Sequence, residues 1–249
     1  MAGTKSRYTR LLVGTDGAGA AWDFSSESNK LGVKLSGEKL DDTTFQSSGK
    51  TAVAGDPEGS ITQSGYWTSP AAGTFDGEMV DAIKNAESLY VAALFGDNVA
   101  ACPAYVAEKT TAENVAIEGA IGGLITVNGD WGAGTGIVRA LRLASGNVAA
   151  TGALTYIDLG AAGLSTGKAW LFVTTVTGTA TNATFTVQCD DNTGFSSPTT
   201  KGTFTLSAGG VYVLSITGGV DRYVRLNCTS KGGATSFDLT ALIAVTGIT

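Results

Sequence analysis

The chain has 249 residues, enough for one large or two modest domains with a substantial buried core. Glycine contributes 35 residues, about twice its usual share of roughly 7%, whereas only 15% of residues are charged and histidine is absent. Without histidine there is no common general base, no Ser-His-Asp or Cys-His arrangement, and no usual nitrogen ligand for zinc. The formal charge of −6 also disfavours nucleic-acid binding, because phosphate contacts require lysine and arginine.

The start of the chain, MAGTKSRYTRLLVG, has no long apolar core, so we expect no signal peptide. No apolar run of the sequence is long enough for a membrane helix.

Residues 1–70 predict two arms of a β-ribbon. In the first arm, KLGVKLSGEKLDDTTF, apolar residues alternate until Gly37 breaks the phase before Leu40, as in a β-bulge. The second arm, KTAVAGDPEGSITQSGYW, is expected to turn at residues 56–59 and then to alternate through Ile61 and Trp67.

One helix is expected at about residues 76–88, with Thr74 or Asp76 as its N-cap. Buried strands should follow in SLYVAALFG, VAACPAYVAE, NVAIEGAIGGLITVNGDW and GTGIVRALRLASG. A single helix among strands can cover one face of a sheet or the end of a barrel. The expected apolar stripe of the helix consists of Phe75, Met79, Val80 and Ile83.

The pattern of predicted elements changes near Ala149. From there on, short strand patterns recur with turns every eight to twelve residues, as in a β-sandwich or jelly roll, and Phe185, Val187 and Cys189 mark one dry face. Trp170, in the apolar run AWLFV, is expected in the core. Charge changes at the same point: residues 1–149 carry 11 basic and 17 acidic residues, and residues 150–249 carry 5 of each. We therefore expect an all-β chain with a domain boundary near 149.

The remaining polar clusters do not match the patterns of catalytic or ligand-binding sites. The adjacent acids Asp41-Asp42 and Asp190-Asp191 point to opposite faces of a strand, which suits turns or edges better than glycoside hydrolysis. DDNTG at 190–194 lacks the spacing of a calcium loop, and GTDGAGA at 14–20 lacks that of a phosphate loop. We expect no enzyme, no cofactor and no metal. DRYVRLNC is read as a core strand with solvated arginines, with a binding role for Arg222 and Arg225 as the alternative.

The cysteines are three in number and widely spaced. Buried free thiols are the expected state of Cys102, Cys189 and Cys228. A disulfide between Cys189 and Cys228 stays open as an alternative if their strands pair.

The ribbon arms resemble the major tail tube proteins of long-tailed, siphovirus-type bacteriophages. In that family a strand ending in D-x-T-x-F precedes a loop of small residues and glycine, and then a strand of the form G-S-hydrophobic-x-x-S-G-aromatic. The resemblance covers about residues 30–145, and the second half is similar to β-sandwich extensions on some phage tail proteins. The matching positions are Asp42, Thr44, Phe45, Gly59, Ser60, Ile61, Ser64, Gly65 and Tyr66.

The resemblance implies a tail-tube-type β-sandwich or barrel domain with a long ribbon over residues 1–149. A jelly-roll or Ig-like β-sandwich would follow over residues 150–249. In the family, subunits form six-fold rings whose sheets close into one barrel, and the rings stack into the conduit for genome ejection. The implied partners are further copies of the chain, the tape-measure protein and tail-completion proteins, with DNA passing unbound and no membrane. The implied location is the virion tail, after assembly in the host cytoplasm.

A ribbon in such a tube has one face toward a water-filled lumen and one toward protein, and neighbouring subunits complete its edges. We expect the acidic first part to form a mildly repulsive wall and the neutral second part to form an outward-facing decoration. The candidate lumen or inter-subunit residues are Glu38, Asp41, Asp42, Thr44, Phe45, Glu58, Ser60, Ile61, Ser64 and Tyr66.

Two other functions compete with the tail tube. A carbohydrate-binding or adhesion β-sandwich protein of a virion or cell surface would use exposed aromatic side chains. An acidic glycosidase would use Asp190 and Asp191.

Overall fold

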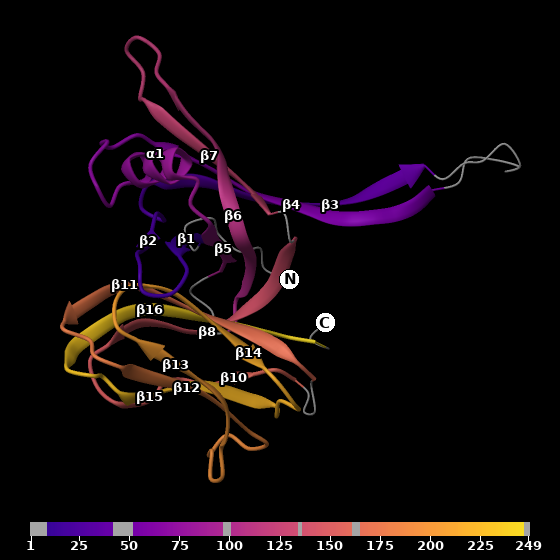
Figure 1. Cartoon of the computed structure of the whole chain (residues 1–249), viewed down its shortest axis with the longest axis vertical. Helices are drawn as coiled ribbons and strands as arrows, with labels where there is room; N and C mark the ends of the chain where they lie inside the picture. The colour runs from indigo at the N-terminus through magenta and orange to yellow at the C-terminus, as the bar shows by residue number, and fades with distance from the viewer. Residues whose placement is uncertain (1–8, 42–51, 97–100, 134–135, 161–164, 247–249) are drawn as a thin grey trace, which may run out of the picture. The chain divides into compact units, whose positions relative to one another are not determined.

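The computed structural model describes residues 9–41, 52–96, 101–133, 136–160 and 165–246. Within these ranges the chain consists of antiparallel β-sheets and one α-helix, which confirms the all-β prediction (Figure 1). Its contacts define two compact units. The sandwich unit comprises Met1–Ser26, Ala92–Val106 and Val138–Thr249, and the ribbon unit comprises Glu27–Val91 and Ala107–Ile137.

This division does not fall at residue 149. β8 (Ile137–Val148) pairs with β16 (Ala234–Val245) from Leu141↔Ile243 to Val148↔Phe237, so strands from both sides of residue 149 share one sheet. Residues 150–249 therefore do not form a separate compact unit in the described structure.

The sandwich unit is built from two sheets. The first has the order β14-β11-β16-β8 and continues through β6 and β5 to β1 and β2, and the second has the order β10-β15-β12-β13, with β9 on β15. The bounds are β1 Thr9–Thr15, β2 Ala21–Asp23, β5 Leu89–Phe95, β6 Pro103–Glu118, β9 Gly152–Ala153, β10 Ile157–Asp158, β11 Gly167–Gly178, β12 Ala183–Asp190, β13 Thr199–Leu206, β14 Gly210–Ile216 and β15 Tyr223–Ser230.

Alternation of side chains along these strands produces the core between the two sheets. On β12, Phe185, Val187 and Cys189 are fully buried as expected, and the ring of Phe185 meets that of Phe237 edge-on, with centroids 5.4 Å apart. Trp170 of β11 is also fully buried, as predicted. Full burial of side chains of this size contributes about 1.5–3 kcal/mol each, so this core is the main source of stability in the unit.

The first sheet curls until its two ends meet. The backbone N–H of Gly17 donates to the Val211 carbonyl at 2.8 Å, and Asp16 and Val211 form an isolated bridge. This junction is one bridge and not a ladder, so the described strands do not form a closed barrel.

The ribbon unit contains a four-stranded sheet in the order β3-β4-β7-β6 and the helix α1 (Figure 1). The bounds are β3 Ser28–Asp41, β4 Ala52–Tyr66, β7 Thr126–Ala133 and α1 Phe75–Asn85. A bulge interrupts the β3–β4 register between Gly37↔Pro57 and Lys39↔Ala54, which confirms the predicted position, although the extra residue lies on β4. The turn expected at residues 56–59 is wrong, because β4 runs through these residues. Proline is tolerated in a strand at such a bulge.

The helix forms where the sequence predicts it and buries part of the expected stripe. Thr74 caps it by accepting a hydrogen bond from Gly77 N–H at 3.4 Å. Phe75 and Met79 are fully buried, whereas Ile83 is 40% exposed and Ala82 takes its place against the sheet. No helix of the described residues has the length and apolar character needed to cross a membrane.

The three cysteines are buried free thiols, as the sequence predicts. The strands of Cys189 and Cys228 do pair, but Cys189 lies opposite Val224, four residues from Cys228. Four residues of a strand span about 13 Å, beyond the Cα separation of about 7 Å that a disulfide tolerates. Burial and a hydrogen bond to the Asp221 carboxylate at 3.0 Å raise the pKa of the Cys189 thiol to about 11.

This pKa predicts a loss of stability at high pH. The folded chain holds the Cys189 proton more tightly than the unfolded chain, so the free energy of unfolding should fall as the pH rises from about 9 to about 11. Urea denaturation at pH 8 and pH 10.5 measures the loss, which should be smaller in the Cys189→Ala variant. An identical pH dependence in both proteins would contradict the assignment.

Candidate functional site

The sheet of the ribbon unit has one polar and one apolar face. On β4, Ile61, Gln63 and Gly65 are buried, while the residues between them point the other way. The buried face packs against α1, where the Phe75 ring meets Trp131 edge-on with centroids 5.7 Å apart. The opposite face is the surface on which most of the described candidate residues lie.

The predicted site residues divide into three groups. Asp42, Thr44 and Phe45 lie outside the described residues, and Glu38 and Asp41 lie on β3 where only the backbone is described. Ile61 is fully buried on the helix side of the sheet. The remaining four share the opposite face of β4: Glu58, Ser60, Ser64 and Tyr66.

Cross-strand neighbours extend this surface over all four strands. Ser60 of β4 lies opposite Lys34 of β3 and Gly132 of β7, and Gly132 lies opposite Thr111 of β6. Hydroxyl, amide and charged side chains alternate along each strand, and we call this surface the polar face. It comprises Lys30, Lys34, Ser36, Glu58, Ser60, Thr62, Ser64, Tyr66, Thr111, Glu113, Thr126, Asn128 and Asp130.

A shallow groove of about 540 Å³ crosses the polar face. Its charged lining consists of two lysines, Lys34 and Lys109, and two glutamates, Glu58 and Glu113. The described charges of the groove therefore balance, and the acidic wall expected from composition stays a prediction, because Glu38, Asp41 and Asp42 have no described side chains.

The glycines of the ribbon motif have a steric explanation. A Cβ at Gly65 would collide with the backbone carbonyl of Glu27, and a Cβ at Gly59 would come within 2.6 Å of the Ile137 side chain. The pattern G-S-hydrophobic-x-x-S-G-aromatic thus has glycine near both ends of the part of β4 that pairs with β7. At these two positions other residues of the same chain come too close for a side chain.

Glu27 ties the two arms of the ribbon to the helix. Its carbonyl accepts the Tyr66 N–H at 3.2 Å, and its carboxylate accepts the Phe75 N–H at 3.1 Å and the Thr68 hydroxyl at 3.0 Å. A carboxylate at a helix N-terminus is stabilised by the helix dipole. Sequence analysis missed this residue, because Glu27 lies 48 positions before Phe75 and no local pattern links them.

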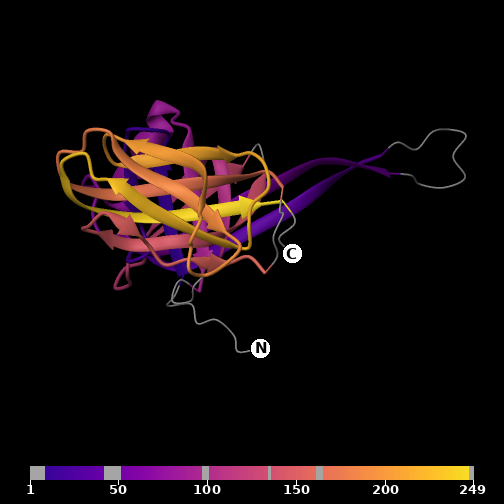
Figure 2. The same ribbon diagram turned by 90° about the horizontal axis from the view of Figure 1, so that it is seen from below.

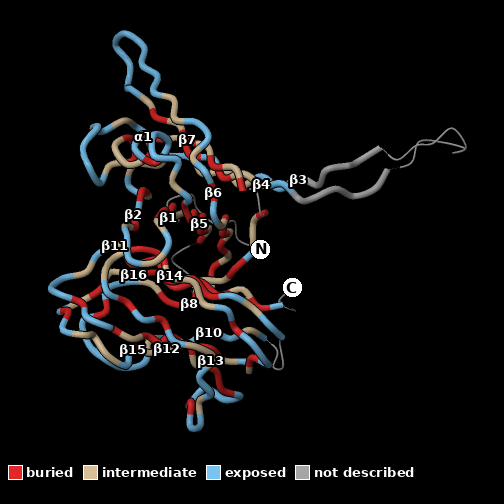
Figure 3. Tube along the Cα trace, in the orientation of Figure 1, coloured by how far each residue is buried: buried red, intermediate tan, exposed pale blue. Residues whose placement is uncertain are grey.

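Besides Ile83 of α1 and Tyr66 of β4, exposed large apolar side chains of the described ribbon unit lie on β3 and on one hairpin. On β3, Leu35 continues the row of Leu31 and Val33 beyond the helix and is 58% exposed. The second place is the hairpin between β6 and β7, whose tip is exposed in Figure 3. There Ile117, Ile121, Leu124 and Ile125 are exposed.

The acidic pair Asp190-Asp191, the candidate for glycoside hydrolysis, lies at the end of β12 and the start of a loop. The Asp190 carboxylate accepts hydrogen bonds from the N–H groups of Asn192 and Ser197, both at 3.1 Å, so it organises its own loop. Among the described residues, no group of three acidic or cysteine side chains could hold a metal ion.

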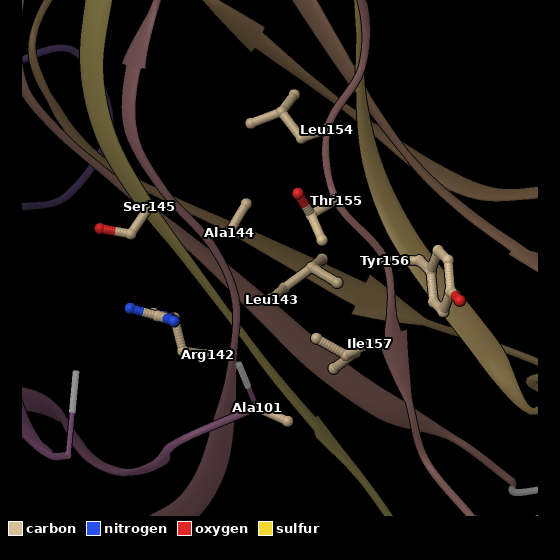
Figure 4. Close-up of a pocket in the computed structure, with 9 residues that line it drawn as sticks. All are labelled: Ala101, Arg142, Leu143, Ala144, Ser145, Leu154, Thr155, Tyr156 and Ile157. Atoms are coloured by element: carbon tan, nitrogen blue, oxygen red, sulfur yellow. The ribbon is translucent and has the colours of Figure 1, made fainter. Parts of the chain in front are cut away.

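The cavity in Figure 4, of about 190 Å³, lies in the sandwich unit and is lined partly by aliphatic side chains. Its lining residues are Ala101, Arg142, Leu143, Ala144, Ser145, Leu154, Thr155, Tyr156 and Ile157, and none of them is a carboxylate or thiol.

Comparison with known proteins finds no matching family model and no significant match among curated proteins. A chain of the SPP1 tail tube resembles the structure with a TM-score of 0.44 and 13% identity, over 55% of this chain and 78% of that one. A chain from the tail of an empty gene transfer agent particle gives 0.35 and 14%, over 45% and 80%. SPP1 Dit, a hub protein of a phage adsorption apparatus, gives 0.33 and 11%, over 94% and 98%.

These three structural neighbours come from a phage tail tube, from the tail of a gene transfer agent particle and from a phage adsorption apparatus. Likeness at this level carries no function over to this chain, so the geometry of the polar face and the ribbon has to support one.

The glycine contacts generate a prediction. Gly65→Ala should lower the free energy of unfolding by about 2–3 kcal/mol, because the new methyl group collides with the Glu27 backbone. Gly123→Ala is the matched control: its nearest neighbour would be the Ala120 carbonyl at 3.4 Å, and the change should stay within about 0.5 kcal/mol. Urea denaturation followed by tryptophan fluorescence measures both, and equal effects would refute the steric explanation.

Proposed function

We propose that this chain is a structural subunit of a phage tail tube, which assembles with copies of itself into rings and stacks of rings around a channel. The observation that carries the proposal is the unsupported part of the ribbon. β3 and β4 pair as far as Asp41↔Ala52, whereas β7 pairs with β4 only from Tyr66 to Gly59 (Figures 1 and 2). The outer part of the ribbon is therefore two-stranded.

A two-stranded ribbon is marginally stable in water on its own. The outer edge of β3 is 14 residues long, more than twice the usual strand length of roughly 5–6 residues, and no described strand pairs with it. Exposed edges of this length are sites of pairing with another chain. The exposed Leu35 lies on this strand, so the strand presents an apolar side chain and an unpaired backbone edge to the same partner. A second copy of the chain supplies the complementary partner at both.

The polar face suits the wall of a channel. Its hydroxyl and amide side chains stay hydrated, and its balanced lysines and glutamates offer no cluster of positive charge to DNA phosphates. We propose that genome and tape-measure protein pass along this face without being bound, and that tail-completion proteins meet the rings at the ends of the tube. For the second sheet of the sandwich unit, within residues 150–249, we propose an outward-facing position.

The proposal predicts that a charge added at Leu35 of β3 prevents assembly, whereas a charge added on the polar face does not. Leu35→Asp should prevent rings and tubes in negative-stain electron microscopy and raise the concentration for self-association at least about tenfold, a change of about 1.4 kcal/mol. Leu35 is already exposed, so the monomer should keep its stability. Ser64→Asp is the matched control, because it adds the same charge on the polar face, opposite Lys30, and should leave assembly intact.

Three outcomes would contradict this function. A wild-type protein that stays monomeric at every concentration and salt would overturn self-assembly. Equal effects of the two substitutions would contradict the assignment of the two faces. Single rings that never stack would remove the tube and leave a ring-forming tail component.

A further inference from the structure

The second sheet of the sandwich unit carries a cluster of aromatic and arginine side chains on its outer surface. The guanidinium carbon of Arg225 lies 4.1 Å from the centroid of the Phe195 ring. The Tyr156 ring stands 5.9 Å from that of Phe195 and meets Tyr223 edge-on at 5.6 Å. Tyr156 is 39% exposed, so the cluster reaches the solvent.

The two arginines of this cluster differ in how their charge is used. Arg222 forms a bidentate ion pair with Asp158, with both N–O distances at 2.8 Å. Arg225 donates only its Nε–H, to the neutral Oε1 of Gln188 at 2.9 Å, and no carboxylate among the described residues pairs with it. The two terminal nitrogens of Arg225 therefore remain a free donor fork, which matches the two oxygens of a carboxylate.

The register of the strands places three complementary side chains side by side, and a fourth adjoins them. Gln188 of β12 lies opposite Arg225 of β15 and opposite Thr200 of β13. Tyr156 precedes Ile157 of β10, and its ring stands beside the Phe195 ring that Arg225 covers. The three paired residues span two strand spacings, about 10 Å, and with Tyr156 they form a row of an exposed ring, a cation, an amide and a hydroxyl.

These groups are held in place before any ligand arrives. Because Arg225 can only donate, Gln188 must turn its oxygen toward it, which leaves the Gln188 amide N–H groups as further donors. The loop that supplies Phe195 is fixed by the Asp190 carboxylate, which accepts the N–H groups of Asn192 and Ser197. A rigid donor fork loses little entropy on binding.

We propose that this row binds an acidic saccharide, a glycan whose sugars carry carboxylates. The carboxylate meets the free fork of Arg225, the apolar face of a sugar ring stacks on Tyr156, and sugar hydroxyls bond to Gln188 and Thr200. A single guanidinium flanked by neutral donors favours one carboxylate over a phosphate chain, which would require several cations. This inference does not depend on ring or tube formation.

The test is titration calorimetry of the full chain with a tetrasaccharide of alternating glucuronic acid and N-acetylglucosamine. Binding should be lost when the carboxyl groups of the probe are reduced to alcohols. Arg225→Gln should weaken binding at least about tenfold, and Arg225→Lys should also weaken it, because lysine keeps the charge but lacks the fork. Arg139→Gln, which removes an exposed arginine of β8 outside the row, is the matched control and should bind like wild type.

Thermal denaturation of each variant separates binding from folding. Arg225→Lys that folds like wild type but binds weakly supports the proposal. The proposal is overturned if wild type does not bind the probe, if the carboxyl-reduced probe binds equally well, or if Arg225→Gln binds like wild type. The assembly variants Leu35→Asp and Ser64→Asp should both bind the probe normally, so this result and the assembly result can fail separately.

Discussion

The two edges of β4 are used differently, and the ribbon unit depends on that difference. One edge pairs with β3 along almost the whole strand, and the other pairs with β7 only over its last eight residues. Buried backbone N–H and C=O groups must be paired. The half of β4 that pairs with both β3 and β7 meets this condition, so it can lie buried under α1. The unsupported half cannot form a core of its own. A two-stranded ribbon is marginally stable on its own, and the assembly proposed above would complete it with a second surface.

The same strand fixes which side chains face water. Side chains alternate with a period of two, so a slip of one residue would turn Ser64 and Tyr66 into the core and expose Ile61. The close approach of Gly65 to Glu27 admits only glycine and therefore sets the register at one point. Glu27 in turn holds the start of α1, so strand register and helix position are fixed by one residue. The polar face results from this constraint and needs no special residue of its own.

Local patterns in the sequence predicted local structure well. The helix, the buried strand at β5 and the dry face of β12 each follow from a periodicity within about ten residues. The turn expected from Asp56-Pro57-Glu58-Gly59 was wrong because pairing with β3 overrides turn propensity. The boundary expected at 149 rested on a change in the pattern of predicted elements. Such a change cannot reveal that β8 pairs with β16 nearly a hundred residues later. The Glu27 contacts and the Tyr156–Arg225–Gln188 row also depend on such distant pairing, so no local signal identifies them.

The charge balance of the groove, more than acidity, suits the conduit proposed above. A strongly acidic wall would repel DNA, but its carboxylates would also repel one another around a closed ring and would weaken assembly. Lysines and glutamates side by side in the groove avoid both effects, because the fields of opposite charges cancel at distances larger than their separation. At physiological ionic strength the electric field that remains is screened within about 8 Å. A polymer moving along the middle of a channel would then meet hydrated hydroxyl and amide groups and a weak net field, so no position along the wall would hold it.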